Sequence, residues 1–535
     1  MSGRQKENKT PGRLAELLPR LREAGIPLQP VNAPVGIAEE ISVSPADWGK
    51  VAQEAAACGL RWSACWGEHY PPQILAKALF FGQDGHLLVQ TALPEKLAEL
   101  PSQTPYYPAA NRPERYLQDM FGVTFTDHPD GRRWMCHQAW WQDQFPLLKE
   151  FPRAGTPEPE TRPDFEYPFA VLPGDGVYEI PVGPVHAGII EPGHFRFHAV
   201  GETVLRLEEH LGYVHRGVEK SAEGRDLASL ARLAGRVSGD STVAHTWAAC
   251  QAAERALGVS VSSRSLFIRA LLAERERVAN HLGDIGAICN DVGFTFAHVQ
   301  FSRLRELWQR QSLALFGHRL LMDVVIPGGV ANDLNTAQIE LLFSEAARFK
   351  QEVGTLMPLL LEYPSLQDRL RDTGILSPQQ AKELGALGYV GRASNQQDDL
   401  RRDLPYAPYD LLSVDVPAYL QGDVAKRVRV RGDEIAVSLG LIEQLLKKIP
   451  ADGPLAVPCA PTGRDCMGIG LIEGWRGETL CYLHLNGAGR VLRYFPRDPS
   501  WLNWPTLEVL IADNIVPDFP VCNKSVNGSY AGHDL

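Results

Sequence analysis

A proline-rich stretch divides the 535-residue sequence into two parts. Proline has no backbone N–H to donate inside a helix, so closely spaced prolines favour extended backbone. A single core stops growing at about 250 to 300 residues, and a chain of this length therefore needs more than one domain. We expect a domain over residues 1–150, a linker over 151–177 and a second domain over 178–535. The prolines of the linker are Pro152, Pro157, Pro159, Pro163, Pro168 and Pro173.

The part before the linker has the pattern of a small α/β domain. Ser44 can cap a helix that has Pro45 at its first position, and this helix should end near Cys58 and Gly59. The run 86–90 is typical of a strand.

Helical patterns dominate the second part. Asp240 or Ser241 can cap an alanine-rich helix that stops at Gly258. The segment 263–286 places its apolar residues largely on one face, which is typical of an amphipathic helix. The predicted fold class is α+β, with a small α/β domain followed by a mainly α-helical domain with peripheral β-structure. Further helices are expected over 300–316, 336–362 and 423–448, with strand-like sequence around 474–489.

Composition narrows the possible functions. The net charge is −11, so no overall basic character favours a nucleic acid or an anionic lipid surface. The polar N-terminus lacks the apolar run of a secretory signal, and no stretch approaches the about 18 apolar residues of a membrane-spanning helix. We therefore expect a cytoplasmic chain with reduced thiols. None of the nine cysteines is spaced as Cys-x-x-Cys, the unit that typically supplies thiolates to a metal.

Several short segments combine glycine, proline, histidine, arginine and acidic residues. His215, Arg216 and Glu219 could share one helix face as a polar cluster, or form a salt-bridged face between subunits. Ser238 or Ser241 with His245 and Asp240 could suggest a nucleophilic triad, but without a nucleophile elbow a helix cap is the simpler interpretation.

Three further segments have simpler structural interpretations. Residues 317–319 and 327–330 are typical of a rigid turn, and residues 476–478 of a hairpin turn. The C-terminal residues 513–535 contain no disorder-promoting repeat, so we expect the end of the chain to be packed inside.

The order and spacing of these segments, from about Tyr178 to Leu535, resemble one family. This is the large subunit of group 4 nickel-iron hydrogenases, such as hydrogenase 4 and formate hydrogenlyase, together with the quinone-site subunit of respiratory complex I. The first part is similar to the small α/β peripheral-arm subunit of complex I over 114–125, 128–130 and 132–133, so two subunits look fused. The motifs of the second part are 183–186, 215–220, 276–282, 327–330, 399–401, Tyr406, Tyr409 and 415–417.

The resemblance also implies where metal ligands would lie. In active hydrogenases, two Cys-x-x-Cys pairs supply four thiolates to nickel and iron, because soft sulfur ligands suit these metals. Here the first pair falls on Ser238 and Ser241, and the second falls on Ser529 and Gly532. A hydroxyl cannot replace a bridging thiolate, so we expect no nickel-iron site and disfavour an active hydrogenase.

The quinone chemistry implied by the complex I relative is also incomplete. That relative donates protons from a histidine and a tyrosine, because reduction of a quinone to a quinol consumes two protons. Its tyrosine falls on Gly239, and its histidine falls on Pro192, although His186 and His194 lie nearby. Glu191 matches a carboxylate that relays protons from the buried site in the hydrogenase-like branch.

The resemblance implies a subunit of a membrane-associated oxidoreductase, NADH dehydrogenase (quinone)-like or hydrogenase-like, that is active only within a complex. Electrons would pass from a 4Fe-4S cluster in an iron-sulfur small subunit to a quinone-like or unknown acceptor. Implied partners also include a ferredoxin-like subunit and antiporter-like membrane subunits, with the chain on the cytoplasmic face of the inner membrane. The alternative is a redox-silent scaffold that couples the electron-input arm to an ion-pumping arm. The sequence contains no G-x-G-x-x-G motif after a strand, so it does not indicate direct binding of NAD.

The site itself is expected in the pocket left by the missing metals. Asp534 and Leu535 should pack there beside Arg236 and His245, with a carboxylate facing Arg236, because an unpaired buried charge is costly. The residues expected to act in catalysis are Glu191, His186, His194, Arg236, His245 and Asp534. Those expected to bind the acceptor are His215, Arg216, Ser238, Ser241 and Ser529.

Overall fold

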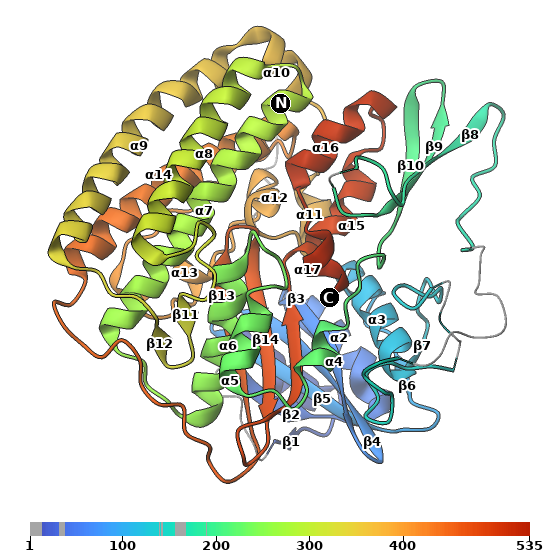
Figure 1. Ribbon diagram of the computed structural model, residues 1–535. Helices are drawn as coiled ribbons and strands as arrows, with labels where there is room; N and C mark the ends of the chain where they lie inside the picture. Colours follow the sequence, from blue (N-terminus) through green and yellow to red (C-terminus); the bar gives the residue numbers. More distant parts are fainter. Residues whose placement is uncertain (1–12, 32–37, 138–139, 141–142, 156–166, 189) are drawn as a thin grey trace. The chain divides into compact units, whose positions relative to one another are not determined.

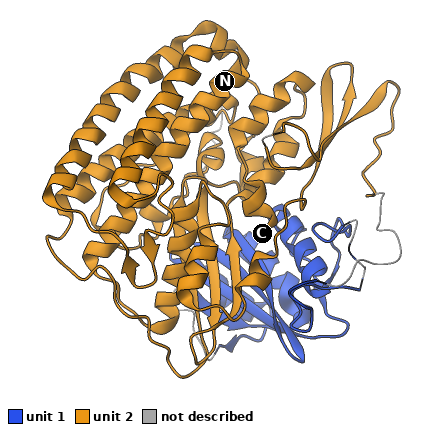
Figure 2. Cartoon of the chain, viewed as in Figure 1, with its two compact units in different colours: residues 1–166 blue, residues 167–535 orange. Residues whose placement is uncertain are grey.

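The computed structural model describes residues 13–31, 38–137, 140, 143–155, 167–188 and 190–535. The chain divides into two compact units, residues 1–166 and 167–535 (Figures 1 and 2). Residues 156–166 of the expected linker lie outside the described residues.

Unit 1 is built on a five-stranded sheet. The strand order is β1 (Gln29–Pro30), β2 (Ala38–Ser42), β5 (Gly85–Pro94), β4 (Gln73–Gly82) and β3 (Arg61–Tyr70). Strand β2 runs parallel to β5, and the other neighbours are antiparallel. The predicted helix begins as the 3-10 turn Pro45–Asp47 and continues as α2 (Trp48–Ala57), and the predicted strand lies within β5, so both predictions are confirmed. The unit also contains α1 (Leu14–Glu23), α3 (Asn111–Phe121) and the parallel pair β6 (Glu99–Pro101) and β7 (Thr124–Thr126).

Four long helices of unit 2 form a layer: α7 (Ser263–Asp291), α8 (Thr295–Phe316), α9 (Thr336–Glu362) and α14 (Val424–Lys448) (Figure 1). Helix α7 packs against α8 and α14, and α14 packs against α9. All four helices were predicted. Helix α7 runs five residues beyond the predicted end at Gly286, because buried Ile288 and Cys289 continue its apolar face.

Glycines bring a helix into close contact with a second sheet of unit 2. Strands β13 (Cys466–Gly474), β14 (Gly477–Leu485) and β15 (Val491–Arg497) are antiparallel, and α6 (Thr242–Leu257) packs on β13. A Cβ atom at Gly468 or Gly470 would lie 2.1 or 1.9 Å from a backbone oxygen of α6. Only glycine permits this approach, which fixes the start of α6 relative to the turn after β13.

Smaller elements complete unit 2. The predicted turn 327–330 joins β11 (Val325–Ile326) to β12 (Gly329–Val330), and the predicted hairpin turn joins β13 to β14. A further antiparallel sheet has the order β10 (Thr203–His210), β9 (His194–Val200) and β8 (Val177–Val182). The remaining helices are α4 (Val218–Ala222), α5 (Leu227–Ala234), α10 (Pro364–Leu370), α11 (Pro378–Glu383), α12 (Gly388–Ala393), α13 (Leu400–Asp403), α15 (Ser500–Leu510), α16 (Phe519–Val526) and α17 (Tyr530–Asp534).

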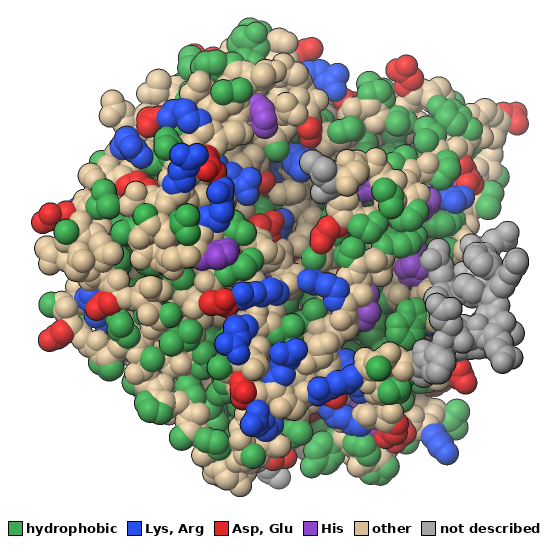
Figure 3. All heavy atoms as spheres, viewed as in Figure 1, with side chains coloured by type: hydrophobic (Ala, Val, Ile, Leu, Met, Phe, Trp, Pro, Cys, Tyr) green, Lys and Arg blue, Asp and Glu red, His purple; other side chains and the backbone are tan. Residues whose placement is uncertain are grey.

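The surface carries both signs of charge. On the face shown in Figure 3, lysine and arginine side chains gather near the centre, over α4 and α5. Among the described helices, none combines the length and the apolar character that crossing a bilayer requires.

Candidate functional site

Two segments that lie far apart in the sequence meet at the start of α6. The Oγ atoms of Ser238 and Ser529 lie 2.8 Å apart, within hydrogen-bond distance. Ser529 also accepts a hydrogen bond from the backbone N–H of Gly532, 2.9 Å away, and thereby caps α17. The Oγ atom of Ser241 accepts a hydrogen bond from the Trp475 indole at 3.0 Å. The three serines are buried and hydrogen-bonded.

An arginine on the β13–β14 turn closes one side of this site. Arg476 donates to both carboxylate oxygens of Asp240, each at 2.7 Å. Burial would raise the pKa of Asp240, but the charge and hydrogen bonds of Arg476 hold that pKa below its usual value. The Ser238 hydroxyl adds a hydrogen bond to the same carboxylate at 2.7 Å.

A buried carboxylate closes the other side. Asp498 lies 2.8 Å from Nε2 of His245 and accepts a hydrogen bond from the backbone N–H of Ser500 at 2.8 Å. Burial would raise the pKa of Asp498, but the hydrogen bond from His245 and the charges of His245 and Arg476 hold that pKa well below its usual range. A Cβ atom at Gly532 would lie 2.7 Å from Cγ of Asp498, so this carboxylate occupies the space beside Gly532.

The prediction that a C-terminal carboxylate faces Arg236 is wrong. The Arg236 guanidinium is exposed and pairs with Asp323, whose Oδ2 lies 2.7 Å from it. Asp534 is fully buried, and its carboxylate accepts a hydrogen bond from the backbone N–H of Val214 at 3.0 Å and lies 2.8 Å from Nδ1 of His533. Exposed Arg236 finds its counter-charge at the surface, and the buried Asp534 carboxylate is satisfied locally.

The packed C-terminus is confirmed. Leu535 is fully buried, and its backbone oxygen accepts a hydrogen bond from the N–H of Arg216 at 2.8 Å.

The predicted cluster of His215, Arg216 and Glu219 on one helix face is wrong. Gly217 takes the left-handed conformation with φ 63° and caps α4, so His215 and Arg216 precede the helix. His215 contacts the backbone oxygen of Asp534 at 2.6 Å, and Arg216 donates to the backbone oxygen of Val237 at 2.8 Å. Glu219 is buried and pairs instead with Arg493 of β15.

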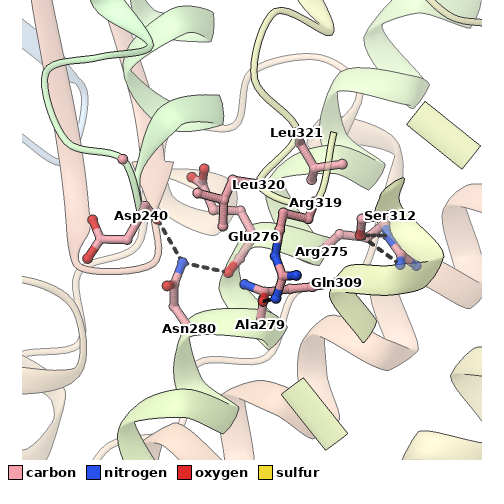
Figure 4. A pocket seen from close by; sticks show the side chains of 11 residues that line it. Asp240, Arg275, Glu276, Ala279, Asn280, Gln309, Ser312, Arg319, Leu320 and Leu321 are labelled. Carbon is pink, nitrogen blue, oxygen red and sulfur yellow. Dashed lines mark hydrogen bonds between the residues drawn. The ribbon is translucent and has the colours of Figure 1, made fainter. Parts of the chain in front are cut away.

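A small polar cavity adjoins Asp240 (Figure 4). Its volume of about 20 Å³ admits about one water molecule and is too small for a quinone ring. The amide of Asn280 donates to the backbone oxygens of Asp240 and Glu276, at 2.7 and 2.9 Å. The Glu276 carboxylate accepts backbone hydrogen bonds from the first turn of α6, and burial raises its pKa to about 8.

A tyrosine that the sequence patterns did not indicate lies beside one of the candidate histidines. The Oη atom of Tyr530 is 3.3 Å from Nε2 of His186. Burial raises the pKa of Tyr530 and lowers the pKa of His186. These residues are 344 positions apart, and no local motif joins them.

Of the candidates Glu191 and His194, Glu191 lies near this pair. Glu191 accepts a hydrogen bond from the backbone N–H of Ala531 at 2.9 Å and is exposed. His194 is buried, and its ring centroid lies 4.9 Å from that of Phe169.

Three side chains in unit 1 are of the types that bind metals, but the histidine among them is already hydrogen-bonded. Ligand atoms of His69, Glu95 and Glu150 lie within 4.8 Å of one another. However, Nδ1 of His69 accepts the backbone N–H of Lys149 at 2.8 Å, so a neutral ring carries its proton on Nε2 and offers no free lone pair. The group therefore fits a hydrogen-bonded histidine better than a metal ligand.

Known proteins match both units. Residues 291–468 match the family described as respiratory-chain NADH dehydrogenase, 49 Kd subunit, and residues 41–157 match the corresponding 30 Kd subunit. Formate hydrogenlyase subunit 5 of Escherichia coli (strain K12) is 33% identical over 82% of this chain and 77% of its own length. The C/D subunit of the NADH-quinone oxidoreductase of Bacteroides fragilis is 31% identical over 73% of this chain and 76% of its own length.

A solved structure shares the fold. It comes from the membrane-bound sulfane sulfur reductase, described as an archaeal respiratory membrane complex. The TM-score is 0.63 and the identity 26%, over 68% of this chain and all of the matched chain.

Proposed function

Since the chain belongs to the family that contains formate hydrogenlyase subunit 5, hydrogenase-4 component G and the C/D subunit of NADH-quinone oxidoreductase, we propose that it forms part of a membrane-associated oxidoreductase without a nickel-iron centre of its own. In this proposal the chain binds an iron-sulfur small subunit and takes part in electron transfer from the partner's cluster. A ferredoxin-like subunit and antiporter-like membrane subunits would complete the assembly.

One observation carries the metal-free part of the proposal. Ser238 and Ser529, which the resemblance assigns to two of the four ligand positions, have hydroxyls that contact each other at 2.8 Å. The Asp498 carboxylate fills the space beside the fourth position, Gly532. These hard, hydrogen-bonded oxygen atoms do not fit a site for nickel and low-valent iron, which require soft thiolates.

The acceptor that we propose is quinone-like and approaches Tyr530 and His186. Reduction of a quinone to a quinol consumes two protons, and a tyrosine and a histidine 3.3 Å apart can supply them. The Tyr530 hydroxyl is protonated at neutral pH and can donate a hydrogen bond to a quinone oxygen. In this proposal the reaction would take place beside the C-terminal helix and not in the ligand positions.

The test uses the purified complex. Bound quinone should be extractable, and quinone-site inhibitors should block its electron transfer. Tyr530→Phe and His186→Gln should each lower kcat by about 10²-fold or more, the usual contribution of a proton donor. Tyr419→Phe is the matched control, because the Tyr419 hydroxyl bonds Asp433 on a different face, and it should turn over normally. Normal turnover of both test variants would exclude this acceptor site.

The alternative is a redox-silent scaffold that couples the electron-input arm to the membrane arm. The hydroxyls of Ser238, Ser241 and Ser529 are hydrogen-bonded within the protein, and this favours the scaffold over an acceptor bound at these positions. A complex that transfers electrons at the normal rate, contains no quinone and is insensitive to such inhibitors would support the scaffold.

A further inference from the structure

A network of fully buried charges lies between the helical layer and β13 of unit 2. Each member is at most 2% exposed. Helix α7 contributes Glu274, Arg277 and His281; α12 contributes Arg392; the segment at α13 contributes Asp399 and Arg401; α14 contributes Glu434; and β13 contributes Glu473.

Arg392 is the centre of the network. Its guanidinium lies 2.5 Å from Glu434, 2.6 Å from Glu473 and 2.9 Å from Asp399. Arg401 joins Asp399 to Glu274, at 2.7 and 3.0 Å.

The third arginine links the network to the candidate site. Arg277 contacts Glu274 at 3.4 Å and donates to the backbone oxygens of Glu473 and Gly474, each at 2.8 Å. The next residue along, Trp475, donates to Ser241, and Arg476 pairs with Asp240.

The charges of this network do not balance. Its four carboxylates face three guanidinium groups, which leaves one net negative charge when every carboxylate is ionised and His281 is neutral. An uncompensated buried charge is costly, so the network favours binding one proton.

Neighbouring charged groups do not supply the missing positive charge. Arg431, which faces His281, pairs with Asp284 at 3.0 Å. Glu478, opposite Glu473 on β14, pairs with Arg497. Two neutral hydroxyls, those of Tyr409 and Ser438, each donate to Glu274 at 2.6 Å.

The proton has one favoured position. Burial, followed by the charge of Asp399, raises the pKa of Glu473 to about 7. Burial alone would also raise the pKa values of Asp399, Glu434 and Glu274, but arginine charges hold all three below their usual values. Burial lowers the pKa of His281, which keeps this ring neutral.

We propose that this network is a proton-binding site, in which Glu473 holds one exchangeable proton that responds to the charge of the Arg476–Asp240 pair. Arg277 and the three residues after Glu473 connect the buried network to the Arg476–Asp240 pair. The inference concerns protons alone and does not depend on the identity of any electron acceptor.

Infrared spectroscopy of the full-length protein tests the inference directly. Between about pH 6 and about pH 9, the carboxylic acid of Glu473 should lose its C=O stretch as it ionises, alongside those of Glu114 and Glu276, whose pKa values of about 7 and about 8 lie in the same range. Glu473→Gln should remove the contribution of one carboxylic acid from this change and leave those of Glu114 and Glu276. Glu345→Gln is the matched control, because Glu345 forms a balanced buried pair with Arg275, and it should retain the change.

Two more variants keep the test informative if Glu473→Gln does not fold. Asp399→Asn removes the carboxylate that raises the pKa of Glu473, so the titration should move to lower pH. Asp240→Asn removes a negative charge from the candidate site and should move it in the same direction. A carboxylic acid titration in Glu473→Gln that equals that of wild type would overturn the proton site. An unchanged titration in Asp240→Asn would overturn the link to the candidate site.

Discussion

The hydroxyls of Ser238 and Ser529 form a hydrogen bond at 2.8 Å across 291 positions of sequence. This contact ties the loop before α6 to the start of the C-terminal helix. It satisfies a hydrogen bond of each side chain within the protein.

The first prediction concerns metal content. Purified protein, alone or in its complex, should carry no nickel at this chain, because Ser238, Ser241, Ser529 and Gly532 supply none of the four thiolates. Elemental analysis per mole of chain measures this. About one nickel per chain would contradict the metal-free site.

A second prediction concerns the buried pair of Asp498 and His245. Asp498→Asn should destabilise the protein by about 1.5 to 3 kcal/mol at neutral pH, the range for a hydrogen bond to a charged group. The folded state depresses the pKa of Asp498, so its contribution is present above the unfolded value of about 3.9 and is lost as the pH falls below it. The two proteins should therefore converge in acid.

Denaturant unfolding across pH measures this difference. Asp323→Asn is the control, because the Asp323–Arg236 pair is exposed and should contribute no more than about 1 kcal/mol. A difference between wild type and Asp498→Asn that stays constant into acid would show that the charge of Asp498 is not what stabilises the site.

A third prediction concerns the C-terminus. Removing residues 528–535 should impair folding or assembly, because it uncovers the pocket that buried Asp534 and Leu535 fill and removes the partner of Ser238. Size-exclusion chromatography of the complex and its turnover are the readouts. Arg236→Ala should behave like wild type, since this side chain is exposed. A truncated chain that assembles and turns over normally would refute the buried-terminus interpretation.

The fourth prediction concerns the order of proteolysis. Limited proteolysis should cut first between Pro152 and Val177, where prolines prevent regular structure. Helix α7 is buried along most of its length and should resist. Mass spectrometry of the first fragments identifies the first cleavage site. Early cleavage within 263–286 would argue against two units joined by a linker.

The sequence predicted the long helices well because their signals are local. The ranges predicted for α9 and α14 agree with the structure, in which Asp423 caps α14 by accepting the N–H of Lys426. The end of α7 was placed too early because Gly286 resembles a stop. In the structure this glycine instead lets Phe301 of α8 pack closely, since a Cβ atom there would lie 3.2 Å from that side chain.

The site was harder to predict because its contacts are not local. Family resemblance identified Ser238 and Ser529, but no spacing rule leads to Asp498, Arg476 or Tyr530. The Arg236–Asp534 pairing failed because it assumed that the arginine was buried. Asp323, which pairs with Arg236, adopts the left-handed conformation with φ 64° in a loop, and no pattern in the sequence predicts that placement.

The glycine at position 532 leaves no room for a side chain beside Asp498. A single substitution to cysteine would place its Cβ 2.7 Å from the Asp498 carboxylate. Asp498 would have to move, and His245 would then lose its buried partner. A thiol at position 532 would therefore need a compensating change at Asp498 before the surrounding hydrogen bonds could be kept.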